Sequence, residues 1–301
     1  MTKFSEYLKN IFLIIIILQF TPPLLQNLKK QWQDNLEPKN LVGLITIDQP
    51  VFASKEYSKQ LQQFFKNQDI KAILLKIDCP GGAAGSTQAL AHEIVQLKKQ
   101  HTKPIVTYSE NICASGGYYI AAMTDYIVAT PSSIIGNIGS KLSTQFKVKQ
   151  FLQDYKITTH SISTGQYKDI MDPFCDLTPE QQHMLQQVSD DCYLQFVKDI
   201  AKQRHLPIQH KDAWADGKLF TGNEALKQKL IDATGNQSAA TDYIKQNILH
   251  SDREIKFIKA PKPTALQQWF KQYDDESEVQ FSLSESLFCS FFNAMKKSFN
   301  L

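Results

Sequence analysis

Hydrophobic and polar positions alternate along this chain in blocks that predict strands and helices in turn. Leu41–Asp48 and Lys71–Asp78 are short apolar runs of the kind that form buried strands. Between them, apolar residues from Tyr57 to Phe65 recur at helical spacing. Strands that alternate with helices of this length indicate an α/β fold with a parallel or mostly parallel sheet.

The same alternation continues through the middle of the chain. Leu90–Leu97 carries a helical stripe, and Pro104–Tyr108 and Asp125–Thr130 predict two more strands. The segment that contains Ser115, between these two strands, is apolar and predicts a helix.

A capping box predicts the start of a long helix. Thr178 and Gln181 have the spacing at which two side chains bond each other's backbone N–H, and Pro179 suits the first helical position. We expect this helix to run to about Gln203. Further elements follow, namely a strand and a helix within Ala215–Asp232, a helix at Ala239–Ile248 and a strand at Glu254–Ile258.

The N-terminus has a different character. Ile11–Leu18 is an unbroken hydrocarbon run, shorter than the roughly 20 residues of a full membrane span and closer to a signal-peptide core. No A-x-A-like cleavage site follows it, which favours an uncleaved anchor. Lysines flank the run on both sides, so the positive-inside rule does not set its orientation. The chain divides into an anchor (1–25), a polar tether (26–40), a folded domain (41–260) and a C-terminal tail (261–301) with no assigned role.

Composition excludes several classes of protein. The 301 residues are 42% hydrophobic, and the net charge of +3 is spread out rather than clustered on a basic face. We therefore expect no nucleic-acid partner. The five cysteines form no C-x-x-C pair, and the seven histidines show no metal-ligand spacing. We expect no metal and no cofactor.

The turn Pro80–Gly82 is the first candidate for chemistry. It lies at the carboxyl end of an expected strand and opens a helix, which is where open α/β sheets bind ligands. Its two glycines let the backbone approach a substrate and leave N–H groups free to donate. Steric needs alone also place glycine in such turns.

Ser115 is the candidate nucleophile. Its surroundings do not match a G-x-S-x-G elbow, since Cys113 stands where the first glycine would be. A serine nucleophile needs a base, and lysine can serve if burial lowers its pKa. Lys168 is the candidate base, in an irregular stretch after an expected strand and between Tyr167 and Ile170. An ordinary loop lysine is the alternative interpretation.

Taken together, four segments resemble the bacterial signal peptide peptidase A family of serine–lysine membrane proteases. They are KAILLKIDCPGG, ICASGGYYIAAMTDYIVATPSSIIGNIG, GQYKDIMDPF with LTPEQ, and ADGKLFTGNEALKQKLID, within roughly residues 41–248. The resemblance implies that Ser115 is the nucleophile, Lys168 the general base, and the backbone N–H groups of Gly82 and Gly116 the oxyanion hole. It also implies a ClpP/crotonase-like fold of repeated β-β-α units with a parallel sheet, an N-terminal membrane anchor helix and an assembly of several protomers.

Two residues near the candidate site depart from the family's pattern. Cys79 replaces the serine that usually precedes P-G-G, and Asn137 replaces a serine in G-S-I-G. Asn137 is a candidate for orienting the amine of Lys168, and support of its own turn is the alternative. Cys79 and Cys113 both neighbour the site, either as small packing residues or as a pair close enough for oxidation to bridge.

The resemblance, together with the apolar N-terminal run, implies a membrane-anchored serine endopeptidase that cleaves hydrophobic peptides, by analogy remnant signal peptides, with its peptidase domain at 41–260. We expect a homo-oligomer in the cell inner membrane, single-pass, with the catalytic domain on the extracytoplasmic side. One alternative is a catalytically silent membrane scaffold of the same fold. A second is a crotonase-like acyl-CoA enzyme.

Overall fold

The computed structural model describes Thr21, residues 40–142 and residues 146–260. Apart from Thr21, the expected anchor (1–25) lies outside the described residues, as do positions 26–39 of the tether and the tail (261–301). None of the helices in the described residues combines the length and the hydropathy that a membrane crossing requires.

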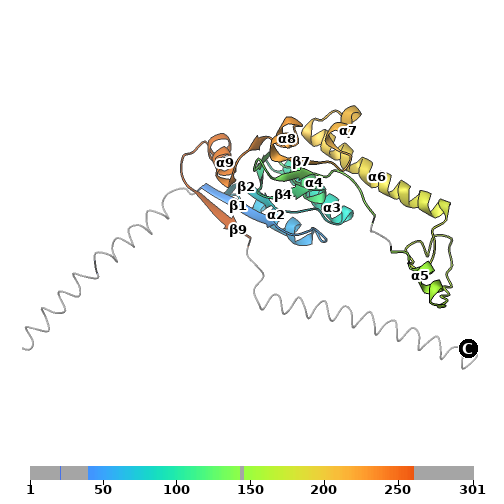
Figure 1. Ribbon diagram of the computed structural model, residues 1–301. Helices are drawn as coiled ribbons and strands as arrows, with labels where there is room; N and C mark the ends of the chain where they lie inside the picture. The colour runs from blue at the N-terminus through green and yellow to red at the C-terminus, as the bar shows by residue number, and fades with distance from the viewer. Residues whose placement is uncertain (1–20, 22–39, 143–145, 261–301) are drawn as a thin grey trace, which may run out of the picture. The chain divides into compact units, whose positions relative to one another are not determined.

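A six-stranded sheet organises the described residues (Figure 1), in the order β8-β5-β3-β2-β1-β9. Its strands are β1 (Asn40–Ile47), β2 (Ile70–Ile77), β3 (Ile105–Ser109), β5 (Tyr126–Ala129), β8 (Ala233–Thr234) and β9 (Ile255–Lys259). The pairs β1–β2, β2–β3, β3–β5 and β5–β8 are all parallel. This confirms the mostly parallel sheet that the alternation of strands and helices predicts.

A smaller sheet contains three short strands in the order β4-β6-β7. These are β4 (Ile112–Ala114), β6 (Ile134–Gly136) and β7 (Leu219–Thr221), with β4 and β6 parallel and β6 and β7 antiparallel. The sequence pattern predicts neither β4 nor β6, each of three residues. β4 is nevertheless the strand that leads into Ser115.

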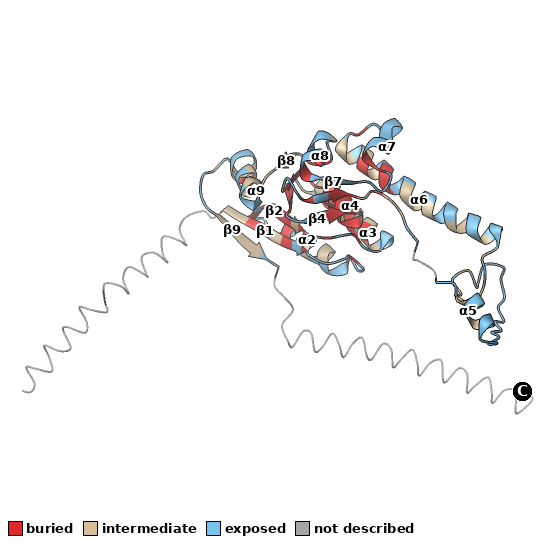
Figure 2. Cartoon of the chain, viewed as in Figure 1, coloured by how far each residue is buried: buried red, intermediate tan, exposed pale blue. Residues whose placement is uncertain are grey.

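Helices cover the sheets. The long ones are α2 (Lys55–Lys66), α3 (Ala84–Gln100) and α6 (Pro179–Arg204), and α4 (Gly116–Ala122) has seven residues. Shorter ones are η1 (Ile208–His210), α7 (Lys211–Trp214), α8 (Gly222–Lys227) and α9 (Gln237–Tyr243), which continues as a π-helical turn η2 (Ile244–Leu249). All seven residues of α4 are buried, and Figure 2 shows burial concentrated in this helix and the central strands.

The capping box at the start of α6 is present as expected. Thr178 Oγ1 accepts a hydrogen bond from the Gln181 N–H at 3.2 Å, and the Gln181 side chain accepts one from the Thr178 N–H at 3.1 Å. Pro179 occupies the first turn. The helix ends at Arg204, close to the predicted end, and its buried residues lie in the C-terminal part, at Phe196, Val197 and Ile200.

Residues 146–178 form a segment that we call the arm. It contains α5 (Lys149–Asp154), which has no buried residue. The arm is held together by its own contacts, such as the ion pair between Lys149 and Asp176 at 2.7 Å and the bond from Val148 N–H to the Pro173 carbonyl at 3.0 Å. No strand precedes Lys168 in the described arm, so that expectation was wrong. A strand needs a neighbouring strand for its backbone groups, and none of the strands in the described residues pairs with positions 156–167.

Candidate active site

Ser115 lies at the sharp turn where β4 ends and α4 begins. Its backbone has φ 51° and ψ −126°, a conformation that a residue with a side chain seldom adopts. Such strain costs about 1–3 kcal/mol, and it clusters at functional sites. The Ser115 carbonyl accepts the first bond of α4, from the Tyr119 N–H at 2.9 Å. A strained strand-to-helix turn that presents a half-buried serine is the geometry of a nucleophile elbow, although the residues differ from G-x-S-x-G.

The Pro80–Gly82 turn is fixed by Val51. The Val51 N–H donates to the Gly81 carbonyl at 2.9 Å, and the Val51 carbonyl accepts from the Ala83 N–H at 3.0 Å. Val51 therefore pairs with Gly82 as in a parallel sheet, and the N–H of Gly82 points away from Val51. A Cβ atom on Gly82 would lie 2.2 Å from the Val51 carbonyl oxygen, so no side chain fits there.

Gly81 brings this turn next to the serine. A Cβ atom built on Gly81 would lie 2.9 Å from Ser115 Cβ, 3.1 Å from its Oγ and 3.4 Å from the Gly116 backbone nitrogen. Gly81 also has φ 137°, which glycine adopts at little cost. The structure thus places the two predicted elements of the site, the glycine turn and the serine turn, in contact.

Gly116 is the first residue of α4, so its N–H has no acceptor within the helix. Among the described residues, neither the Gly116 N–H nor the Gly82 N–H has a hydrogen-bond acceptor. Free backbone N–H groups beside a serine hydroxyl can stabilise a negative charge that develops on a substrate oxygen. The geometry at Ser115 is therefore suited to attack on a carbonyl.

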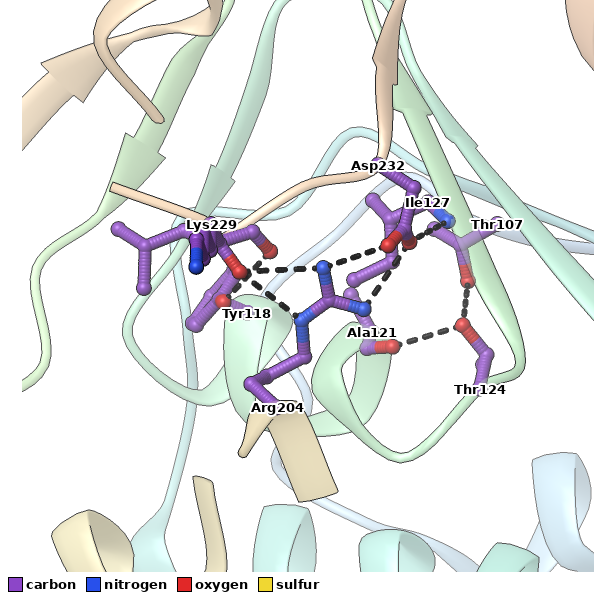
Figure 3. Close-up of polar contacts among 9 residues, drawn as sticks. Thr107, Tyr118, Ala121, Thr124, Ile127, Arg204, Lys229 and Asp232 are labelled. Carbon is purple, nitrogen blue, oxygen red and sulfur yellow. Dashed lines mark hydrogen bonds and ion pairs between the residues drawn. The ribbon is translucent and has the colours of Figure 1, made fainter. Parts of the chain in front are cut away.

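Buried polar contacts hold α4 at its centre (Figure 3). Tyr118 is fully buried, and its hydroxyl donates to the Leu230 carbonyl at 2.7 Å. Beside it, the guanidinium of Arg204 binds both carboxylate oxygens of Asp232 at 2.9 Å. Asp232 in turn accepts the Ile127 N–H at 2.7 Å. These contacts tie the end of α6 to β5 next to the helix that follows Ser115.

A second contact fixes the far end of α4 (Figure 3). Thr124 Oγ1 donates to the Ala121 carbonyl at 2.7 Å and lies 2.9 Å from Thr107 Oγ1 on β3. Both threonines are buried. The helix behind Ser115 is therefore held at its middle and its end, which suits a residue that must keep a strained conformation.

Tyr119 connects α4 with α3 and α6. Its ring stacks on Phe196 with centroids 4.5 Å apart, and its hydroxyl donates to Asp199. His92 Nε2 lies 2.8 Å from the same carboxylate. Burial and the bond to Asp199 raise the pKa of Tyr119 far above its usual range. Tyr119 therefore stays a neutral donor that positions α6 against the helix of the candidate nucleophile.

Lys168 lies in the arm, and its side chain is exposed. Its N–H donates to the Gly165 carbonyl at 3.0 Å, within a turn. In the part of the chain that the structure describes, no hydrogen bond or ion pair joins Lys168 to Ser115 or to the Pro80–Gly82 turn. The arm also contains a cavity of about 650 Å³, which is lined by residues from Lys149 to Asp176 and does not include Ser115. The role of Lys168 as the general base stays a prediction.

Asn137 directly follows β6, the strand that pairs with β4 next to Ser115. Its N–H donates to the Lys218 carbonyl at 2.6 Å, and its φ is 51°. Asparagine tolerates this left-handed conformation better than most residues, which favours the turn-support interpretation. Its side-chain oxygen would be 3.9 Å from a Cβ atom on Gly217, so the side chain faces that loop.

Cys79, which follows β2, forms an isolated bridge with Cys113 on β4, and both thiols are free and fully buried. Burial raises the pKa of both thiols, and that of Cys113 far more. Protonated, buried thiols react slowly, which favours the packing interpretation for Cys113. Cys79 has hydrogen bonds as well.

Several residues that shape the site carry no signal in the sequence. Val51 fixes the glycine turn, and Arg204 with Asp232 anchors the surroundings of α4. Val51 belongs to an isolated bridge rather than a strand, and the ion pair joins residues 28 positions apart. Neither leaves a periodic signal in the sequence. The oxyanion role of the Gly116 N–H stays a prediction.

Comparison with known proteins identifies the class. The model of peptidase family S49 matches residues 97–249, which include Ser115, Asn137 and Lys168. The chain is 35% identical over 202 residues to a protein of Methanocaldococcus jannaschii that is provisionally named a protease, covering 67% of this chain and 64% of that protein. It is 30% identical to a provisionally named signal peptide peptidase of Enterococcus faecium, and the match covers 68% of this chain and 60% of that protein. It is 26% identical to the chloroplastic serine protease SPPA of Arabidopsis thaliana, covering 70% and 31%.

The chain belongs to peptidase family S49. This confirms the resemblance to the signal peptide peptidase A family. The matched region spans less than two thirds of the length of all three relatives described above.

Proposed function

We propose that this protein is a serine endopeptidase in which Ser115 is the nucleophile. One observation supports this more than any other: the strained turn at Ser115 lies against the Gly81–Gly82 turn, with two free backbone N–H groups beside it. The family match and the relatives named as proteases support the same activity.

The reaction follows from these groups. Ser115 Oγ attacks the peptide carbonyl carbon while its proton passes to a neutral Lys168 amine. The carbonyl π electrons move to oxygen, and the Gly82 and Gly116 N–H groups donate to the resulting oxyanion. When the oxyanion collapses, the C–N bond breaks and the Lys168 ammonium protonates the departing amine. A water molecule, deprotonated by the same amine, then hydrolyses the acyl-serine.

The exposure of Lys168 supports a site shared between protomers. A lysine base must lose its proton near neutral pH, which requires burial or a neighbouring positive charge. The arm of one chain does not bury Lys168, so a second protomer would supply the remaining walls. Large apolar side chains in the arm are exposed, at Phe146, Phe151, Tyr155, Ile157, Ile162 and Met171. Exposed apolar surface of this extent marks an interaction site, so we propose a homo-oligomer.

We further propose that the N-terminal run Ile11–Leu18 anchors the protein in the cell inner membrane, with the catalytic domain outside the cytoplasm. Hydrophobic peptides that remain in the membrane, such as remnant signal peptides, would then be the substrates. A substrate already held at the bilayer needs no separate apolar pocket to be concentrated there.

Labelling with a fluorophosphonate probe tests the proposal. The full-length protein in detergent should be labelled covalently, and the Ser115→Ala variant should not be labelled. Ser86→Ala is a matched control, since Ser86 Oγ donates to the Phe52 carbonyl outside the proposed reaction path. Absence of labelling in the natural protein would favour a silent scaffold, and labelling of Ser115→Ala would assign the nucleophile elsewhere.

A further inference from the structure

Cys79 connects the two halves of the candidate site through its backbone. It follows β2 directly before the Pro80–Gly82 turn. Its N–H donates to the Ile112 carbonyl at 2.8 Å, and its carbonyl accepts from the Ala114 N–H at 3.1 Å. Ala114 immediately precedes Ser115. The position of Cys79 is therefore fixed relative to the nucleophile.

The side chain of Cys79 reaches forward to the glycine turn. Its thiol donates to the Gly81 carbonyl at 3.1 Å, and it accepts a hydrogen bond from the Gly81 N–H at 3.4 Å. The Gly81 carbonyl also accepts from the Val51 N–H at 2.9 Å. Two donors on different segments thus hold one carbonyl group.

That carbonyl belongs to the same peptide unit as the N–H of Gly82. A trans peptide is planar, so the Gly81 C=O and the Gly82 N–H point in opposite directions and turn together. No cis peptide bond occurs in the described residues. Because glycine at 81 leaves this peptide plane with the largest rotational freedom, the two donors supply the restraint that its own backbone lacks.

The chemical state of Cys79 fits this task. Only a protonated thiol can donate to a carbonyl oxygen, and burial raises the pKa of Cys79, which keeps the proton in place. A thiolate would repel both the Gly81 carbonyl and a nearby oxyanion. Cys113, equally buried on the opposite strand, has no hydrogen bond from its thiol to this turn in the described residues.

We propose that Cys79 is a positioning residue for the oxyanion hole: its thiol holds the Gly81 carbonyl and thereby aims the Gly82 N–H at the substrate oxygen. This inference rests on the proposed peptidase function. The thiol does not touch substrate and acts only through the peptide plane that follows.

The experiment compares four full-length proteins with the same fluorophosphonate probe and a chromogenic peptide substrate: the natural chain, Cys79→Ala, Cys79→Ser and Cys113→Ala. Cys79→Ala removes the donor and acceptor together with one buried sulfur. We expect kcat and the maximal labelling rate to fall about tenfold, with KM changed less than twofold, because a small misalignment acts mainly in the transition state. Cys79→Ser keeps a donor and an acceptor and should restore at least half of kcat. Cys113→Ala, which removes the same buried sulfur, should lower thermal stability similarly while kcat stays within about twofold.

Every outcome distinguishes the alternatives. If kcat of Cys79→Ala equals that of the natural chain, or if Cys79→Ser is as slow as Cys79→Ala, the thiol does not position the turn. If Cys113→Ala loses as much kcat as Cys79→Ala, buried volume rather than hydrogen bonding is responsible, and the inference is wrong. Should Cys79→Ala not fold, Cys79→Val fills the space without polar atoms and gives the same comparison. If the natural chain itself is not labelled, the proposed function fails, which is a separate result from the loss of this inference alone.

Discussion

The backbone N–H of Ser115 donates to the carbonyl of Gly136 at 2.7 Å. This bond joins the strained serine turn to the end of β6, one residue before Asn137. The N–H of Asn137, which belongs to the same peptide unit as the Gly136 carbonyl, donates to the Lys218 carbonyl. The conformation at Asn137 therefore determines the direction in which the Gly136 carbonyl supports the serine. Any effect of residue 137 on catalysis has two origins, its backbone conformation and its side-chain amide, and they can be separated.

Substitution of Asn137 separates these two origins. Asn137→Gly adopts φ 51° without strain but has no amide, whereas Asn137→Leu loses the amide and is strained by about 1 kcal/mol. If the residue only supports its turn, Asn137→Gly should keep kcat within about twofold and Asn137→Leu should lower the melting temperature. If the amide orients Lys168, Asn137→Gly should lower kcat severalfold with unchanged stability. Peptide hydrolysis and thermal unfolding of both variants decide between the roles, and Asn137→Ser shows whether a hydroxyl suffices.

Much of the fold follows from the sequence, because long elements leave a periodic signal. The buried runs that become β1 and β2 and the capping box of α6 lie within one or two residues of their predicted places. The predicted helix at Ala239–Ile248 is instead α9 followed by a π-helical turn, since the pattern of apolar residues does not distinguish these hydrogen-bond registers.

The site was predictable only in part. Ser115 and the glycine turn have recognisable neighbours in the sequence, but their contact through Gly81 is a property of the fold. The φ of 51° at Ser115 leaves no mark on composition, because a serine with a positive φ has the same neighbours as an ordinary one. The environment of Lys168 depends on which surfaces surround the arm, and one chain's sequence carries no such information.

The strained backbone at Ser115 should lower the stability of the folded protein, and substitution by glycine should relieve that strain. Ser115→Ala keeps a Cβ atom in the strained conformation, whereas Ser115→Gly removes it. Because this strain costs about 1–3 kcal/mol and glycine loses about 0.5–1 kcal/mol of entropy, we expect Ser115→Gly to be the more stable by about 1 kcal/mol. The melting temperature should then be higher by roughly 2–4 °C. Both variants should be inactive. Equal melting temperatures in differential scanning calorimetry would show that the turn stores no strain.

The ion pair between Arg204 and Asp232 should be costly to break from one side. The side chain of Arg204 is 8% exposed and that of Asp232 is 27% exposed. Arg204→Met leaves a partly buried carboxylate without its partner, which should lower the free energy of unfolding by about 2–3 kcal/mol. In Arg204→Met with Asp232→Asn, the amide oxygen can still accept the Ile127 N–H. We expect this double variant to recover about 1 kcal/mol. Urea unfolding of Arg204→Met, Asp232→Asn and the double variant measures the coupling, and strictly additive losses would contradict it.

Tyr118 should make the folded state sensitive to alkaline pH. Burial raises the pKa of its hydroxyl far above the ordinary value of 10.0. Above about pH 10 the unfolded chain releases this proton while the folded chain retains it, so stability falls as the pH rises from there. At pH 7 the free energy of unfolding of Tyr118→Phe should be lower by about 1 kcal/mol, because the buried Leu230 carbonyl loses its donor. Its stability should then fall less steeply than that of the natural chain between pH 9.5 and 11. Parallel slopes in urea titrations at these pH values would exclude Tyr118 as the responsible group.

Mixed oligomers test whether Lys168 completes the site of a neighbouring protomer. Ser115→Ala and Lys168→Ala should each be inactive alone, since one lacks the nucleophile and the other the base. Lys168→Arg should not restore activity, because a guanidinium stays protonated.

If Lys168 acts on the serine of its neighbour, a mixed assembly pairs a Ser115→Ala chain with a Lys168→Ala chain so that some sites hold both groups. The two variants can be unfolded together in equal amounts, refolded and assayed for peptide hydrolysis. If chains mix at random and each site draws on two chains, the mixture should show about a quarter of the natural activity. The same treatment of each variant alone provides the control and should give none. A mixture that stays inactive although mass spectrometry shows mixed assemblies would place both groups on one chain, and the arm would then have to close over its own Ser115.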